Sequence, residues 1–316
     1  MITPEDLTVY AMVATPFTSD GDIDLDAFSQ LVDQMCQAGV GIYLGSGGAG
    51  EGHALTLPEL SALYRTGVEV VAGRVPVAAN PPEPRTARAM LGVATAAADA
   101  GVDLVQLYSP DPGHAMEPTR AELDGYYRFL LERLDCRIAL SVHANSSYRV
   151  PPDLLAALCG QFPSIEAINI VMPIDYHLEI QDALAAAVDR EIRLYTSMRT
   201  MVDGLLIGCH GLLAAEPNLI PFTMQRLARS VIGDGTREET ARLHRFVLEL
   251  GRGVKRWHPS TARWIKMGLL VLGGPGGNGV LREPYVLPPA AEIDRMRELF
   301  DRLRVAEIEA ESRAHL

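Results

Sequence analysis

The feature that most constrains this chain is a regular alternation of short β-like runs with amphipathic helical stretches. The strand–helix unit recurs eight times within the first 232 of the 316 residues. Such alternation predicts a parallel sheet with helices outside it, and eight units over about 230 residues favour a closed barrel over an open sheet. We therefore predict an α/β fold, a (β/α)8 TIM barrel in residues 1–232, followed by a helical extension in residues 233–316.

The expected boundaries come from runs of period-2 and period-3.6 apolar residues. The strands are expected at 9–15, 41–44, 75–79, 104–108, 137–142, 165–170, 192–196 and 211–214. Helices are expected at 26–38, 57–71, 85–100, 120–134, 152–161, 174–188, 198–207 and 220–232. In the extension, three helices are expected at 236–254, 260–272 and 288–313, with a glycine-rich turn at 273–277 before the third.

The composition limits which classes of partner the protein is expected to bind and in which compartment it is expected to lie. The net charge is −12, which argues against a nucleic-acid partner. No apolar run reaches the ~20 residues that a bilayer span needs, and the acidic start does not resemble a signal peptide. The four cysteines are scattered without a CxxC pair, as expected for core thiols in a reducing compartment. We expect a cytoplasmic protein without a membrane partner.

Lysine is nearly absent from the chain. Lys255 and Lys266 are the two lysines among 28 basic residues, and both fall in the predicted extension. Imine-forming catalysis needs an amine beside the substrate carbonyl. Neither lysine is expected to reach the mouth of the barrel, so the sequence predicts that lysine Schiff-base chemistry is absent.

Several segments, in order and spacing, resemble the dihydrodipicolinate synthase and N-acetylneuraminate lyase family. They are Ala-Thr-Pro-Phe at 14–17, Gly-Gly-Ala-Gly-Glu at 47–51, Gly-Val-Asp at 101–103 with Ser-Pro at 109–110, the strand at 163–170, the segment 208–221, and two C-terminal stretches at 266–269 and 281–284. The resemblance implies the barrel fold, a lyase activity on small carbonyl compounds and a homo-oligomer, either a dimer or a tetramer.

The departures from the family pattern fall on its chemistry. The resemblance implies a Schiff-base lysine at the end of the sixth strand, where this chain has Asn169, and a tyrosine at the end of the fifth strand. We match that tyrosine to His143, with Ser141 as the alternative. The two threonines of the glycine-rich loop are replaced by Gly48 and Ala49, and the tyrosine of the fourth-strand loop is absent near residues 111–112.

The remaining polar groups near the strand ends are the candidate site, because barrel sites lie on the loops after the strand C-termini. His143 could transfer protons near neutral pH, and Asn169 could donate a hydrogen bond to a carbonyl or enolate oxygen; each could instead be structural. Arg199 could pair with a carboxylate or form a surface salt bridge, and Glu51 is expected to support its loop. The residues expected to bind substrate are Gly48, Ala49, Glu51, Asp111, His114, Arg199 and Glu216.

Three functions follow. The first is a lyase or hydratase that works by acid–base catalysis and oxyanion stabilisation, without a covalent intermediate. The second is a metal-assisted enzyme, which the absence of an HxH or HxxxH pair disfavours; its ligands would come from His53, His114, His143, Asp111 or Glu51. The third is a non-catalytic protein that binds a small acid or a protein partner. The titratable groups favour the first, with a small-molecule substrate and no metal or cofactor.

Overall fold

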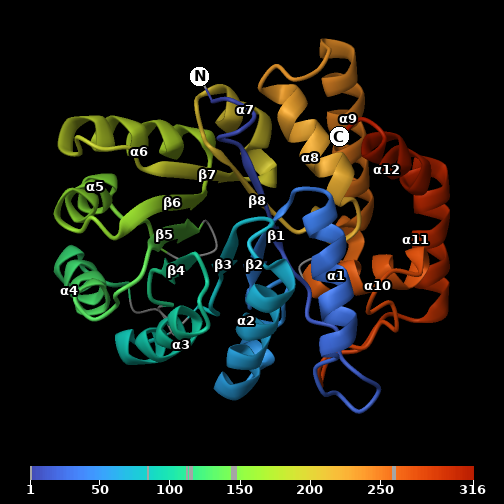
Figure 1. Ribbon diagram of the computed structural model, residues 1–316, viewed down its shortest axis with the longest axis horizontal. Coiled ribbons are helices and arrows are strands. Elements are labelled where there is room, and N and C mark those ends of the chain that lie inside the picture. The colour runs from blue at the N-terminus through green and yellow to red at the C-terminus, as the bar shows by residue number, and fades with distance from the viewer. Residues whose placement is uncertain (1, 84, 112, 114–116, 144–147, 258–260) are drawn as a thin grey trace.

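Eight parallel strands close into a ring, and helices surround it (Figure 1). In this computed structural model, the structure describes residues 2–83, 85–111, 113, 117–143, 148–257 and 261–316. The prediction of a (β/α)8 barrel with a helical extension is confirmed. The strands are β1 (Thr8–Met12), β2 (Gly41–Leu44), β3 (Val77–Ala79), β4 (Leu104–Tyr108), β5 (Ile138–His143), β6 (Ile165–Val171), β7 (Arg193–Ser197) and β8 (Gly211–Ala214).

Each strand leads into a helix on the outside of the ring. The barrel helices are α1 (Leu25–Gln37), α2 (Leu57–Val71), α3 (Ala87–Asp99), α4 (Arg120–Leu131), α5 (Pro152–Gln161), α6 (Ile174–Ala187), α7 (Met201–Leu206) and α8 (Pro221–Val231). Short 3₁₀ turns follow three strands: η1 (Gly52–Ala54), η2 (Met198–Thr200) and η3 (Glu216–Asn218). Within the described residues, no helix is both long and apolar enough to span a bilayer.

The seam between β1 and β8 closes the ring. Thr8 pairs with Gly211, and a β-carbon at Gly211 would lie 1.8 Å from the Thr8 carbonyl oxygen, so only glycine fits there. The strand expected at 9–15 ends early, at Met12. The Ala14 N–H instead donates to Asn218 Oδ1 at 2.9 Å, so a side chain from η3 replaces the strand ladder at the start of the loop.

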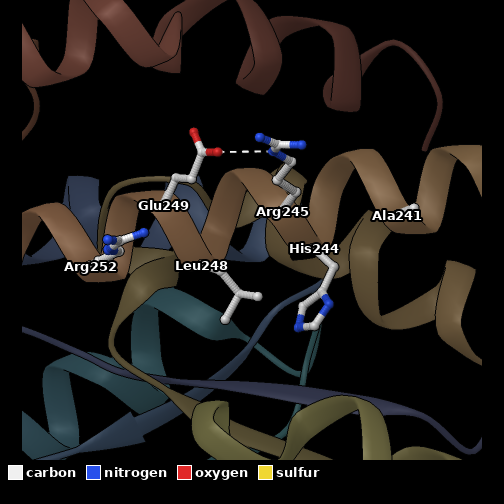
Figure 2. Close-up of a pocket in the computed structure, with 6 residues that line it drawn as sticks. All are labelled: Ala241, His244, Arg245, Leu248, Glu249 and Arg252. Atoms are coloured by element: carbon white, nitrogen blue, oxygen red, sulfur yellow. Dashed lines mark hydrogen bonds and ion pairs between the residues drawn. The ribbon is translucent and has the colours of Figure 1, made fainter.

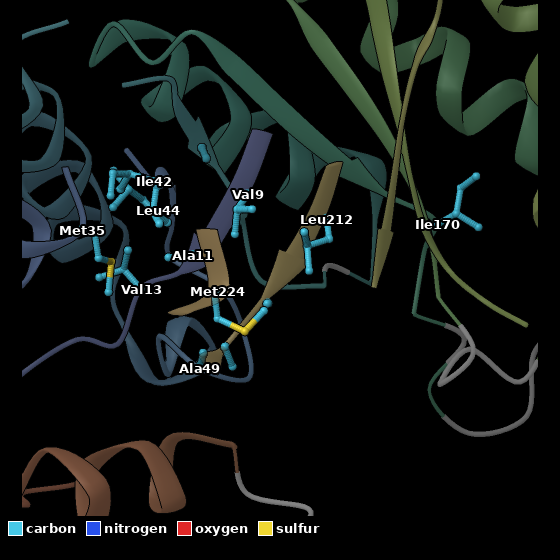
Figure 3. Packing of buried hydrophobic residues seen from close by; sticks show 14 of the residues in the cluster. Val9, Ala11, Val13, Met35, Ile42, Leu44, Ala49, Ile170, Leu212 and Met224 are labelled. Carbon is cyan, nitrogen blue, oxygen red and sulfur yellow. The ribbon is translucent and has the colours of Figure 1, made fainter. Parts of the chain in front are cut away.

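Alternating side chains divide the core into two layers. Tyr10 of β1 points into the ring, where its ring centroid lies 5.1 Å from that of Tyr43 and 5.3 Å from that of Tyr195. The neighbouring β1 residues Val9 and Ala11 belong to the other cluster, between the strands and the helices. Figure 3 shows part of this outer cluster, where side chains of β1, β2 and β8 gather near Met35 of α1 and Met224 of α8.

The extension packs against α8 and contains α9 (Arg237–Val254), η4 (Lys255–Trp257), α10 (Thr261–Leu272), α11 (Ala290–Leu303) and α12 (Val305–Arg313) (Figure 1). The single helix expected at 288–313 is wrong, because Arg304 adopts a left-handed conformation with φ 54° and separates α11 from α12. The break turns α12 toward α8. Its Glu309 accepts hydrogen bonds from the N–H groups of Phe222 and Thr223, at 2.8 and 2.9 Å, and so caps the first turn of α8.

A buried ion pair joins the extension to the loop after β2. Lys266 Nζ of α10 lies 2.5 Å from Glu51 Oε1, and the two side chains are 1% and 3% exposed. Lys266 also donates to the Val280 carbonyl at 2.7 Å and lies 4.0 Å above the Phe17 ring. The Arg282 N–H donates to the other oxygen of Glu51 at 3.1 Å. These contacts with Glu51 therefore hold the glycine-rich loop at residues 47–51 against the extension.

Removing one partner of this pair should destabilise the fold strongly, because the other charge stays buried and unpaired. We expect Lys266→Met to lower the free energy of unfolding by about 3–5 kcal/mol. The matched control Arg297→Met breaks an exposed pair with Asp294 and should cost less than about 1 kcal/mol. Urea unfolding followed by circular dichroism measures both. Equal losses for the two variants would contradict this account of the joint.

Candidate functional site

A row of uncharged polar side chains crosses the inside of the ring near the C-terminal ends of the strands, which we call the barrel mouth. In the strand register, Tyr108 of β4 pairs with Ser141 of β5, and Ser141 pairs with Asn169 of β6. Ser141 and Asn169 are buried. His143 lies two residues beyond Ser141, on the same side of β5 and one step nearer the mouth.

Three carboxamides in this region form a continuous hydrogen-bonded chain, here called the amide chain: Asn80, Gln106 and Asn169. Asn169 Nδ2 donates to the Tyr43 hydroxyl at 2.6 Å and also to Gln106 Oε1. Gln106 Nε2 in turn donates to Asn80 Oδ1 at 2.8 Å. Both N–H groups of Asn169 are therefore engaged. Its Oδ1 is buried and has no hydrogen-bond partner in the described structure. The Nδ2 of Asn80 is also buried without a partner of good geometry, although the Asn80 amide interacts with the Tyr108 hydroxyl.

A pocket of about 800 Å³ opens at the ends of β4 and β5, where Tyr108 and His143 are the last strand residues. One wall is apolar and includes Leu55, which precedes α2, and Leu57 and Leu60 of its first turn. The polar groups that line this central pocket are His53, Glu83, Arg85, Tyr108, Ser109, Asp111 and His143. Aliphatic walls with a few convergent polar groups are typical of small-molecule sites.

The surroundings hold His143 in its neutral form at neutral pH. Burial lowers the pKa of its imidazole below the usual value, and the positive charge of Arg199 on η2 lowers it further. A neutral imidazole can accept a proton from a substrate. The pKa of the Tyr108 phenol is shifted upward instead, because burial and, to a smaller extent, the charge of Glu83 raise it well above the usual range. Tyr108 therefore remains a hydrogen-bond donor.

Two carboxylates stand at the rim of the central pocket. Asp111 forms an exposed ion pair with Arg85, with 3.5 Å between Asp111 Oδ2 and Arg85 Nε. Glu83 keeps part of its surface in solvent, yet the surrounding pocket walls raise the pKa of its carboxyl, and Asp111 raises it further. The raised pKa favours the protonated form of Glu83, and the charge of Asp111 is offset by Arg85.

The structure brings some of the predicted site residues together and separates others. His143 and Asp111 line the central pocket, and Arg199 is exposed but close enough to His143 to influence its charge. Gly48 is exposed on its loop, whereas the Ala49 side chain is buried in the outer core. His114 lies outside the described residues.

Two predicted carboxylates lie elsewhere. Both oxygens of Glu51 are engaged, by Lys266 and by the Arg282 N–H, which favours the loop-supporting role over direct substrate contact. Glu216 is half-buried after β8, where its Oε2 accepts from the Ala215 N–H at 3.1 Å, and burial raises the pKa of its carboxyl. Neither residue lines the central pocket.

Sequence reasoning missed Tyr43, Asn80, Gln106 and Tyr108. One signal was present: Gln106 interrupts an otherwise apolar strand at 104–108, and a polar residue in a buried strand needs a hydrogen-bond partner. The partners come from three other strands or strand ends, so spacing along the chain could not identify them. Within the described residues there is also no group of three His, Cys, Asp or Glu side chains placed to hold a metal ion.

A second depression lies far from this chemistry, on the outer face of α9. Figure 2 shows that one helix supplies all of its lining side chains, with His244 and Leu248 projecting from the helix and Arg245 paired with Glu249 at 2.9 Å. Its volume is about 380 Å³. A site on one face of one helix brings no convergent groups together, so the central pocket is the better candidate.

The link between Arg199 and His143 can be measured directly. Because a positive charge disfavours the imidazolium, Arg199→Ala should raise the pKa of His143. Nuclear magnetic resonance titration of the imidazole in the parent and the variant measures this, and Arg229→Ala, on α8, is the matched control. A His143 pKa that stays the same or falls in Arg199→Ala would show that Arg199 does not act on this histidine.

Comparison with known proteins agrees with this architecture. A family model described as the dihydrodipicolinate synthetase family matches residues 6–299. The chain is 28% identical to 4-hydroxy-tetrahydrodipicolinate synthase 1 of Halalkalibacterium halodurans over 293 residues, which cover 92% of this chain and 94% of that protein. It is 26% identical to the 4-hydroxy-tetrahydrodipicolinate synthase of Chlorobium phaeovibrioides over 286 residues, covering 90% and 92% of the two chains.

Solved structures share the fold. A putative dihydrodipicolinate synthetase from Pseudomonas aeruginosa superimposes with a TM-score of 0.82 at 23% identity, over 94% of this chain and 99% of that one. The prophage protein YagE from E. coli K12, solved in complex with pyruvate, gives 0.83 at 21% identity, over 95% and 99%. With a family match that spans nearly the whole chain, the conclusion is that this chain belongs to the dihydrodipicolinate synthetase family.

Proposed function

We propose that this chain is a lyase of the aldolase, dehydratase or hydratase type that acts on a small oxo or hydroxy acid, or a related carbonyl compound, without a lysine imine. The observation that carries the proposal is Asn169: a buried amide, bonded to Tyr43 and Gln106, stands in β6 beside Ser141. An amide nitrogen is not a nucleophile. Of the two lysines, Lys266 is held by Glu51 outside the ring, and Lys255 begins η4.

In the proposed mechanism, the neutral imidazole of His143 accepts a proton from the carbon beside the substrate carbonyl. The negative charge that develops on the carbonyl oxygen needs a hydrogen-bond donor. The sequence assigned this role to Asn169, but both of its N–H groups are already committed. Tyr108 lines the central pocket as a neutral phenol and takes the donating role in this proposal. Asn169 then acts as a positioning residue for the amide chain.

The register also bears on which residue replaces the family tyrosine. Ser141 is the β5 residue directly beside Asn169, whereas His143 is beside Val171. We propose that Ser141 occupies the tyrosine position and that His143 acts one step nearer the mouth. The alternative is a non-catalytic binding protein. The carboxamide of Asn169 favours this alternative, because an amide cannot titrate.

Hydrogen exchange beside the carbonyl tests the proposal. In D2O, the protein should exchange protons of at least one member of a panel of small 2-oxo acids and their amides, as followed by nuclear magnetic resonance. His143→Ala should slow this exchange by roughly 10²-fold, because a general base contributes about that much. The rate in the parent should rise as the pH passes upward through the lowered pKa of His143 and then level off.

His244→Ala, on the outer face of α9, is the matched control and should exchange at the parent rate. An unchanged rate in folded His143→Ala would remove His143 from the mechanism. If the parent exchanges no member of the panel, the non-catalytic alternative replaces the lyase.

A further inference from the structure

The amide chain ends in two open hydrogen-bonding positions of opposite kind. Gln106 uses its oxygen toward Asn169 and its nitrogen toward Asn80. This leaves one acceptor, Asn169 Oδ1, without a hydrogen-bond partner. The donor Asn80 Nδ2 also lacks a partner of good geometry, although the Asn80 amide interacts with the Tyr108 hydroxyl, which lines the central pocket. The oxygen and nitrogen of all three amides could be exchanged together, with the Tyr43 hydroxyl donating to Asn169. The open atom of Asn169 would then be a donor, and the open atom of Asn80 would be an acceptor. One donor and one acceptor would still remain, so the conclusion does not depend on the amide orientations.

The amide chain lies one strand step before Tyr108 and His143, which line the central pocket, and none of its three residues lines the pocket itself. Gln106 precedes Tyr108 by two residues on β4, so both side chains lie on the same side of the strand, and Tyr108 lines the pocket. Asn80 and Asn169 are 1% and 0% exposed. A buried polar atom without a partner is costly, and the same atom is favourable when a ligand group completes its hydrogen bond.

The charges around the row limit what that ligand group can be. Among the described residues that line the pocket, Arg85 is the one arginine or lysine, and it is exposed at the rim beside Asp111. A carboxylate has acceptors only. A carboxylate placed against the amide chain would face the open acceptor oxygen of Asn169, and no arginine or lysine among the described pocket-lining residues is buried there to balance its charge. Burying an unpaired charge in this way is strongly unfavourable.

We infer that the part of the ligand that enters the barrel is an uncharged group with both a donor and an acceptor, namely a hydroxyl or a carboxamide, which completes the open ends of the amide chain. Any carboxylate of the ligand stays outside the amide chain, toward Arg85 at the rim. The inference rests on the proposed function only in taking the central pocket as the ligand site. It narrows the substrate class to compounds whose inward end is neutral.

Lactamide and lactate test this directly, because lactate carries a carboxylate where lactamide carries a neutral carboxamide. Dissociation constants can be measured by ligand-observed nuclear magnetic resonance titration on the full chain. Lactamide should bind at least about tenfold more tightly than lactate, because a site built for a hydrogen-bonding group rejects one that leaves its partners unpaired. Asn169→Leu should abolish lactamide binding.

Gln181→Leu is the matched control, since the Gln181 amide bonds to the Ile207 carbonyl on the outside of the barrel, at 2.9 Å. It should bind lactamide as the parent does. Lactate binding as tight as or tighter than lactamide, no binding of lactamide, or unchanged lactamide binding in folded Asn169→Leu would each overturn the inference. If Asn169→Leu does not fold, the comparison of the two ligands on the parent decides. Lactamide binding without hydrogen exchange would uphold this inference while the proposed function fails.

Discussion

Closure of the ring is the constraint on which the rest of the structure depends. Because β1 pairs with both β2 and β8, every strand has two neighbours, and the side chains of each strand must alternate between the inside of the ring and the helices. Only this closure brings Asn169 to Tyr43, 126 residues away, and to Gln106, 63 residues away. A shift of one residue in the register of β6 would turn Asn169 outward and put its neighbour Ile168 inside.

Much of the fold could be predicted from sequence, because the pattern of apolar residues reports local periodicity. The expected strands 41–44, 104–108 and 211–214 agree with the observed bounds. The break at Arg304 could not be predicted, because a left-handed arginine is stabilised by the contact of α12 with α8 and not by its own neighbours. The amide chain was hidden for the same reason: its members are joined by the stagger of the strands around the ring, which a linear sequence does not display.

The position of charge inside the molecule follows a consistent division. The inside of the ring is neutral along Asn80, Gln106, Ser141 and Asn169, while the buried ion pair of Lys266 and Glu51 lies between the loop after β2 and the extension. Burial lowers the pKa of Lys266 to about 8, with Glu51 opposing the shift. A lysine with a lowered pKa is often a nucleophile, but this one is enclosed by Glu51, Phe17 and the Val280 carbonyl. These contacts favour a structural role for Lys266.

The central claim is that this member of the family works without a lysine imine, and borohydride trapping with pyruvate tests it most directly. Pyruvate and borohydride are added together to the full chain, and the intact mass and the peptides are measured by mass spectrometry. The account predicts no reduced pyruvate adduct on the protein, because it places neither lysine beside the substrate carbonyl. A stable adduct on Lys266 or Lys255 would contradict it, and would mean that one of these lysines reaches a bound 2-oxo acid.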